Sequence, residues 1–286
     1  MGQVSGFLQH LDYGVGTSVS ASVGKVTGGT WGPHNSGADY DFSIGGIPSP
    51  KYALFVPEGS CTFWPTSVGI IASCRRASFT STAPPLLVFQ GGNSREAFQH
   101  ASAYVDKLGL ECSAPDGKLT ASLSWKAISP TIISVPTWQA HSAGSEFHWF
   151  QATCTLGTQS CQMQSFKIDV SNNLAADTSL DGGTAGYLRL PEEITAGNET
   201  ITGNFTVAIP PSTDALAESW KDVPDATVAA SLVFVNAAVS PVTLNLALAN
   251  MTITNWSFNY VDSSSRSVYT IDYIGKPNTA DTLTIS

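Results

Sequence analysis

The residues of this chain that could do chemistry are its histidines and two closely spaced aspartates. His141 and His148 could bind a metal ion together with Glu146, but seven residues is a poor spacing for two ligands on one strand or helix. Asp39 and Asp41 could act as the paired carboxylates of a glycosidase, although Gly- and Ser-rich segments commonly carry acidic residues for solvation. The other histidines are scattered: His10, His34 and His100. We expect no catalytic, cofactor-binding or metal-binding residue.

The motifs of nucleophilic, phosphate and metal chemistry are missing from the sequence. It has no Gly-x-Ser-x-Gly elbow, no glycine-rich phosphate loop and no His-Glu-x-x-His. The five cysteines are an odd count without the spacing of a disulfide scaffold. Cys154 and Cys161 could close a hairpin in an oxidising environment, whereas Cys112 is expected to be a small core residue. We therefore expect that the chain is not an enzyme and uses no cofactor.

Composition and charge narrow the class of protein further. Charged residues make up 12% of the chain and hydrophobic residues 42%, which predicts a real core under a largely neutral surface. The net charge of −9 argues against a protein that grips nucleic acid, which needs clustered Lys and Arg, but an acidic wall would let DNA slide past. The sequence shows neither a signal peptide nor a membrane-spanning run, so we expect folding in a cytoplasm and no membrane partner.

Apolar residues alternate with polar ones along most of the chain, which predicts β-strands. The clearest strands are 166–170, 204–209 and 243–248. The runs 256–260 and 268–273 predict a hairpin, because polar turn residues separate them. Short helices are predicted after Pro65 and Pro211, where proline ends a strand and a following Ser or Thr can cap the helix.

One β-rich unit is present twice in the sequence. Residues 61–89 align without gaps on 206–234, and residues 104–128 align on 252–276. In the first block, identical residues keep one spacing: Pro65, Ser67, Ala72, Thr82, Leu87, Val88 and Phe89 meet Pro210, Ser212, Ala217, Thr227, Leu232, Val233 and Phe234. In the second block the alternation persists without identity. The alignment predicts two copies of one fold.

The predicted fold is mainly β, with two tandem β-sandwich or barrel domains that each carry one short flanking helix. The domains are expected at 1–134 and 135–286. Residues 14–51 are rich in Gly, Ser and Pro and are interpreted as a long loop, and residues 129–147 as the link between the copies. Residues 277–286 are expected to be a free or strand-adding C-terminal arm.

Several segments resemble bacteriophage tail tube proteins. They are Cys161–Leu174, Pro191–Ile209, the helix after Ser212, the hairpin ending at Lys276, and Val105–Ser124. The resemblance covers most of 161–276 and extends more loosely over 52–128. It points to a siphophage-type major tail tube protein with a duplicated tube domain.

The resemblance implies a structural protein of the virion tail that is assembled in the bacterial cytoplasm. Tube domains of this kind form rings around a lumen that carries DNA, and a chain with two domains would form a trimeric, pseudo-hexameric ring. The implied partners are further copies of the chain, the tape measure, terminator and distal tail proteins, and phage DNA that passes through without specific binding.

Two alternatives remain open at the level of sequence. A carbohydrate-binding or adhesive β-sandwich could use some of the seven Trp and eight Tyr as stacking platforms. However, Trp125, Trp256 and Tyr273 fall at alternating strand positions, where core packing is expected. The chain could also be another tail component, such as a terminator or a fibre.

Overall fold

A computed structural model describes most of the chain. The described residues are 6–7, 9–35, 40–41, 49–50, 55–76, 83–114, 117–140, 145–157, 159–176, 191, 193–209, 227–259, 267–275 and 283–286. Their structure is almost entirely β, and α1 (Gly69–Ser73) and the 3-10 turn η1 (Trp149–Gln151) are the helical elements among them.

The strands divide into those before and those after η1. The first group is β1 (Gly6–Phe7), β2 (His10–Val15), β3 (Ala21–Ser22), β4 (Lys25–Asn35), β5 (Tyr40–Asp41), β6 (Ser49–Pro50), β7 (Phe55–Trp64), β8 (Leu87–Gly92), β9 (Ala97–Ser113) and β10 (Thr120–Ile133). The second group is β11 (Ala152–Leu156), β12 (Gln159–Ser171), β13 (Leu174–Ala176), β14 (Ile194–Ala196), β15 (Thr200–Ile209), β16 (Thr227–Val235), β17 (Thr243–Asn259), β18 (Ser267–Gly275) and β19 (Leu283–Ile285).

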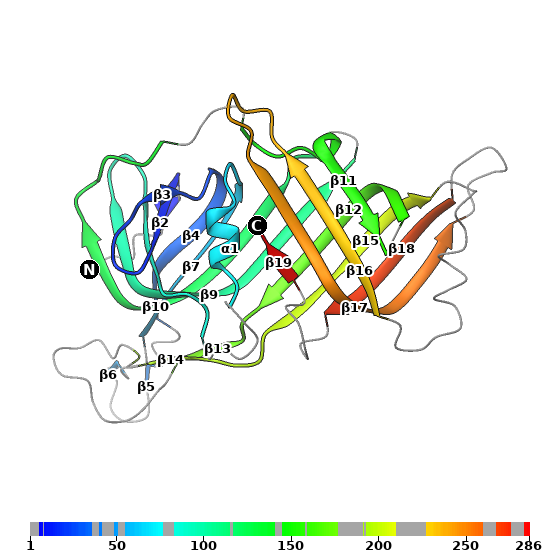
Figure 1. Cartoon of the computed structure of the whole chain (residues 1–286). Helices are drawn as coiled ribbons and strands as arrows, with labels where there is room; N and C mark the ends of the chain where they lie inside the picture. The colour runs from blue at the N-terminus through cyan, green and yellow to red at the C-terminus, as the bar shows by residue number, and fades with distance from the viewer. Residues whose placement is uncertain are drawn as a thin grey trace.

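Six strands of the second group form a closed barrel. Their order is β12-β11-β16-β17-β18-β15, and β15 pairs back to β12, always antiparallel (Figure 1). β12 illustrates why these sequences form strands: Phe166, Ile168 and Val170 are buried, whereas Lys167 between them is exposed. The alternation predicted from the sequence therefore gives each strand one face for the core and one for the surface.

The strands of the first group have the same neighbours in the same order. β2, β8, β9, β10, β7 and β4 pair in sequence across the sheet, and β3 and β1 add to β2 and β4. β9 then joins the two groups, because residues 97–103 pair with β8 while residues 107–113 pair with β12. One sheet consequently runs from β4 through the first group into the barrel of the second group (Figure 1).

The hairpin β9–β10 and the hairpin β17–β18 share one pairing register. Leu108 lies opposite Leu123 in the first hairpin, and Trp256 lies opposite Ile271 in the second. These are the residues that the alignment of 104–128 on 252–276 equates. Alternation of apolar and polar residues does not specify which residues of two strands lie opposite each other. The shared register of the two hairpins is therefore a second observation, separate from that alternation, that agrees with the alignment.

Irregularities in the pairing also recur at equivalent places. Each group has one shift within its hairpin, β9–β10 or β17–β18, and one where the hairpin meets the preceding strand, β8–β9 or β16–β17. A third shift lies in the pairs β4–β7 and β12–β15. The shifts fall at Ser124/Trp125 and Ile253/Asn255, at Val26/Gly28 and Met163/Ser165, and at Leu87/Phe89 and Val228/Ala230. Bulges are retained features of a fold rather than accidents of one strand.

The pairing corrects the alignment of 61–89 on 206–234. With the shifts superposed, Phe63 is equivalent to Val207, one residue away from its aligned partner. Leu87 is equivalent to Val228, four residues away from its aligned partner. The identical residues in that block had suggested a single ungapped register, but loops of different length before each strand change it.

Each group has a glycine directly opposite an aromatic residue of the neighbouring strand, and the two glycines are equivalent in the corrected register. Gly59 of β7 lies opposite Trp125 of β10, and a Cβ on Gly59 would stand 2.0 Å from the indole. Gly203 of β15 lies opposite Tyr273 of β18, and a Cβ there would stand 2.0 Å from the Lys167 carbonyl oxygen and 2.5 Å from the phenol oxygen. Both rings are buried and stack on a phenylalanine, Phe89 for Trp125 and Phe205 for Tyr273. Only glycine leaves room for the ring at these positions.

The structure confirms the predicted strands and the first predicted helix. Residues 166–170, 204–209 and 243–248 lie within β12, β15 and β17. The hairpin predicted at 256–273 is β17–β18. The helix after Pro65 is α1, which begins at Gly69 without a side-chain cap. The helix predicted after Pro211 lies outside the described residues.

Three expectations about loops and tails change. Residues 14–51 are not one long loop, because β3 and β4 lie within them and β4 pairs with β7 over its whole length. Glycines at 28, 29 and 32 interrupt the alternation of β4, which hid this strand in the sequence. The predicted link 129–147 begins later, since β10 continues to Ile133. The arm 277–286 does add a strand, as β19 pairs with β17 of the same chain.

Candidate assembly surface

The outer face of the central sheet is a continuous polar surface. Eight antiparallel strands lie side by side in the order β4-β7-β10-β9-β12-β15-β18-β17, four from each group. Cross-strand neighbours on this face are mostly hydroxyl, amide and charged residues. They include Thr30, Ser60, Ser122, Ser124, Lys107, Gly109, Glu111, Lys167, Asp169, Thr202, Asn204, Asp272, Asn255 and Ser257. We call these eight strands the central sheet and this surface its polar face.

Two lysines on the polar face, Lys126 and Lys167, have carboxylates beside them. Lys167 Nζ lies 2.8 Å from Asp169 Oδ2, and its hydrogen bond to Asp169, followed by the attraction of that charge, raises the pKa of the ammonium group. Lys126 Nζ donates to the carbonyl of Leu174 at 2.7 Å and lies 3.7 Å from Asp106 Oδ2. These pairs reduce the positive potential that the lysines would otherwise present to phosphates.

The junction between the two groups is formed by β9 and β12. Residues 165–171 of β12 pair with residues 113–107 of β9, including Ile168 with Leu110 and Val170 with Leu108. Because the same stretch of β12 pairs with β15 on its other edge, the sheet crosses from one group to the other without a break. The apolar side chains of these strands are buried on both sides of the junction.

Hydrogen bonds between buried polar groups stabilise the end of this junction. Asn172 is fully buried, and its Nδ2 donates to the carbonyls of Cys74 at 3.0 Å and Val105 at 2.9 Å. The Arg75 guanidinium forms two hydrogen bonds with Glu199, 3.2 Å from Nε to Oε1 and 2.8 Å from Nη2 to Oε2. Both partners of this ion pair are buried, so each compensates the desolvation of the other. Each of these contacts joins a residue before η1 to one after it.

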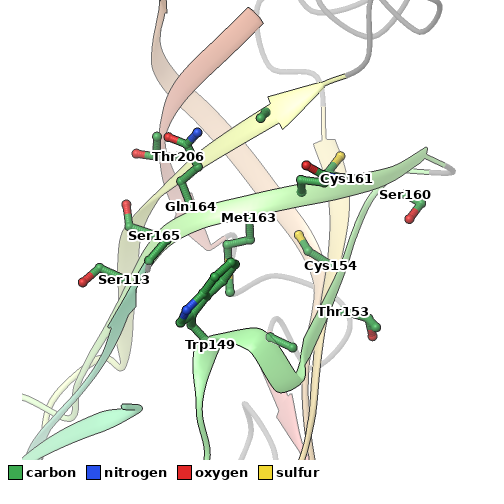
Figure 2. A pocket seen from close by; sticks show the side chains of 14 residues that line it. Ser113, Trp149, Thr153, Cys154, Ser160, Cys161, Met163, Gln164, Ser165 and Thr206 are labelled. Atoms are coloured by element: carbon green, nitrogen blue, oxygen red, sulfur yellow. The ribbon is translucent and has the colours of Figure 1, made fainter. Parts of the chain in front are cut away.

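A cavity of about 800 Å³ opens where β9 stops beside β12. Figure 2 shows Trp149 lying against β12 near Met163, with Cys154 and Cys161 on neighbouring strands. The lining residues are Ser113, Ala114, Trp149, Ala152, Thr153, Cys154, Ser160, Cys161, Gln162, Met163, Gln164, Ser165, Thr206 and Ala208. None of them is acidic, basic or a histidine, and the two cysteines among them are fewer than the ligands that a protein metal site uses.

Glu146 and His148, two of the residues that the sequence offered for chemistry, have other contacts in the structure. Glu146 accepts a hydrogen bond from Lys118 Nζ at 3.4 Å, and the ring of His148 lies against Phe150. His141 and Asp39 lie outside the described residues, as does the side chain of Asp41. Within the described ranges, no three side chains of His, Cys, Asp or Glu come close enough to share a metal ion.

The cysteines behave as core residues in the part of the chain that the structure describes. Cys154 and Cys161 lie directly opposite each other on β11 and β12, as thiols rather than a disulfide. Burial, followed by the neighbouring Cys161, raises the pKa of the Cys154 thiol to about 12. Cys112 is buried as predicted, and burial raises the pKa of its thiol to about 11.

One buried histidine was not singled out by its sequence context. Trp125 Nε1 donates to His100 Nδ1 at 3.0 Å, and burial lowers the pKa of His100 to about 4. The imidazole therefore serves as a neutral acceptor inside the core. Its position at an inward-facing site of β9 became clear only when the pairing of β8, β9 and β10 was known.

The sequence also did not predict the exposure of Trp256. It was expected in a core, but 38% of this side chain is exposed, whereas Leu108 at the equivalent place is 1% exposed. The difference arises because β12 covers β9 at Leu108, while the described strands pair with β17 at Trp256 only on its β18 side. Trp256 thus marks a strand edge that the described strands leave open.

No helix in the described ranges has the length and apolar character needed to cross a membrane.

A closed barrel and a long antiparallel sheet with one polar face define the fold as a β-protein. The chain matches the model of the phage tail tube protein family over residues 2–281, and it belongs to that family. It is thus a structural component of the phage tail and not an enzyme, and membership implies self-assembly with other tail proteins and a place in the virion. No curated protein matches the chain.

Proposed function

We propose that this protein is the major tail tube subunit of a siphophage, with two tandem tube domains at 1–134 and 135–286. Three chains close a pseudo-hexameric ring, and stacked rings form the conduit through which DNA enters the host. The observation that carries the proposal is the central sheet, which contains four strands from each group and crosses the β9–β12 junction without a break.

The repeated pairing supports the duplication. Both groups have the same strand neighbours and the same three register shifts, and in both a glycine lies opposite an aromatic residue at the equivalent position. Unrelated antiparallel sheets share alternation but have no reason to share bulges. The β9–β12 junction then serves as an internal version of the contact between successive tube domains around the ring.

The size of the central sheet suits a ring of three chains. Eight strands from each of three copies give a barrel of about 24 strands. With roughly 4.8 Å between strands and a tilt of about 40°, the distance across such a barrel is roughly 48 Å between backbones. This leaves a lumen wide enough for a DNA duplex after side chains are added.

The polar face is the surface that would line the lumen. Its hydroxyl and amide groups keep the wall wetted, and lysines such as Lys126 and Lys167 have carboxylates beside them. A wall of this kind offers phosphates few unpaired cations, so DNA can pass without being held. The proposed protein partners are further copies of the chain and the tape measure, terminator and distal tail proteins, without a membrane contact.

Electron microscopy of negatively stained protein, first dilute and then concentrated, tests the proposal. We expect hollow tubes or stacked open rings at high concentration, and class averages with threefold symmetry that approximates sixfold. Rings with six chains would refute the trimer while leaving the tube. Monomers at every concentration would refute assembly of the chain into a tube by itself.

A further inference from the structure

We propose that β17 of one chain pairs with the β4 edge of a second copy, and that β1 covers this edge until the second copy arrives. The proposal rests on the proposed ring and adds the strands, their register and an exchange step. It follows from the edges of β17 and β4. Their equivalents, β9 and β12, pair with each other at the internal junction, whereas β17 and β4 of one chain do not.

The first of these edges belongs to β17. Residues 251–252 pair with both β16 and β18, whereas among the described strands residues 253–259 pair only with β18. In β9 the equivalent edge is occupied, because it continues from β8 onto β12. Trp256 is consequently exposed where Leu108 is buried. A strand added to this edge would cover Trp256 and complete the pairing of β17.

The second edge belongs to β4, which is the equivalent of β12. β4 pairs with β7, and β12 pairs with β15, through a shift at the same place, Val26/Gly28 in β4 and Met163/Ser165 in β12. On the edge away from β15, residues 165–171 of β12 pair with β9. The equivalent residues of β4 are 28–34. In the same superposition Asn35, the last residue of β4, is equivalent to Asn172, which directly follows β12.

Superposing the two groups fixes the register of the contact between chains. Lys167 lies opposite Glu111 at the internal junction, and their equivalents are Thr30 and Asn259. The equivalents of Asp169 and Gly109 are Gly32 and Ser257 by the same rule. We therefore assign Thr30 of one chain opposite Asn259 of the next, in an antiparallel pairing.

In the single chain, β1 already lies on this part of β4. Gly6 pairs with Trp31 and Phe7 pairs with Thr30, while the same two residues of β4 pair with β7 on the other side. A strand has only two edges, so β1 and an incoming β17 cannot both occupy Thr30 and Trp31. The two-residue strand β1 shields an edge that would otherwise pair at random, and its short length makes it easy to displace.

Disulfide trapping tests the register. The Thr30→Cys, Asn259→Cys double variant should give covalent dimers and trimers on a non-reducing gel when tubes are oxidised. The Thr30→Cys, Asn255→Cys variant is the matched control, because four residues along the strand place the second thiol beyond disulfide reach. Lys167→Cys with Glu111→Cys is the positive control for the same geometry inside one chain. The five native thiols are buried and should contribute little background.

A second cross-link tests the exchange. Phe7→Cys with Thr30→Cys should tie β1 to β4 when the monomer is oxidised, and this form should fail to make tubes. Reduction with dithiothreitol should restore assembly. The Thr30→Cys single variant, treated identically, controls for the substitution and for the oxidant.

The outcomes separate this inference from the function that it extends. Normal tubes in which Thr30 and Asn259 give no covalent oligomer would overturn the register and leave the tube intact. Oxidised monomers with β1 tied to β4 that still assemble would overturn the exchange. Absence of tubes from the unmodified chain at all concentrations would instead count against the proposed function.

Discussion

Mild acid should destabilise the folded monomer through His100. This imidazole is buried, accepts a hydrogen bond from the Trp125 indole and lies among aromatic rings, including Phe98 at 4.8 Å between ring centroids. Protonation would place a charge in that environment and remove the acceptor at Nδ1. The folded state therefore favours the neutral form, which is why its pKa is lowered to about 4.

The two pKa values set the size and direction of the effect. The unfolded chain binds the proton with a pKa near 6.5 and the folded chain with one near 4, so unfolding takes up a proton between these values. Stability is retained above pH 6.5 and is lost as the pH falls towards 4. Between pH 7 and pH 5 the loss from this residue is about 2 kcal/mol, and it approaches about 3 kcal/mol near pH 4.

Urea unfolding of dilute monomer, followed by tryptophan fluorescence at several pH values from 7 to 5, measures this loss. His100→Gln is the matched control, because its amide oxygen can accept from Trp125 and does not titrate in this range. The variant should lose about 2 kcal/mol less than the original chain between pH 7 and pH 5. An identical pH dependence in both proteins would show that His100 is not the group responsible.

Three further changes test the packing and the junction. Gly59→Ala should lower the free energy of unfolding by about 1–3 kcal/mol, because the new Cβ meets Trp125, and Trp125→Leu should relieve part of that loss in a double variant; additive losses would contradict the contact. Glu199→Ala should cost about 3–5 kcal/mol by leaving Arg75 buried and unpaired, as measured by urea unfolding, and a loss below 1 kcal/mol would place the pair in solvent. The raised pKa of Cys154 predicts slow iodoacetamide labelling at pH 8 until the chain unfolds, and mass spectrometry showing rapid native labelling would contradict its burial.

The sequence by itself determined the class of fold, because alternation of apolar and polar residues is a local property. It predicted the strands at 166–170, 204–209 and 243–248, the β17–β18 hairpin and the buried Cys112, all of which the structure contains. It also pointed to the tail tube family, to which the chain belongs. The missing catalytic motifs could likewise be recognised by reading along the chain.

Strand pairing could not be determined in that way. A period of two looks the same at every register, so the ungapped alignment placed Phe63 one residue and Leu87 four residues from their structural equivalents. The equivalence of Gly59 and Gly203 was hidden for the same reason. The glycines of β4 removed the alternation altogether, and this strand became visible only through its pairing with β7.

The candidate assembly surface was decided by tertiary structure alone. β9 meets β12 across more than fifty residues of chain, and no local pattern specifies which edge of a strand stays open. Trp256 and Leu108 have the same place in the alternation, yet only Leu108 is covered, because a second strand reaches β9 and none of the described strands reaches that edge of β17. Local periodicity sets which face of a strand is apolar, whereas long-range pairing sets which edges remain for a partner.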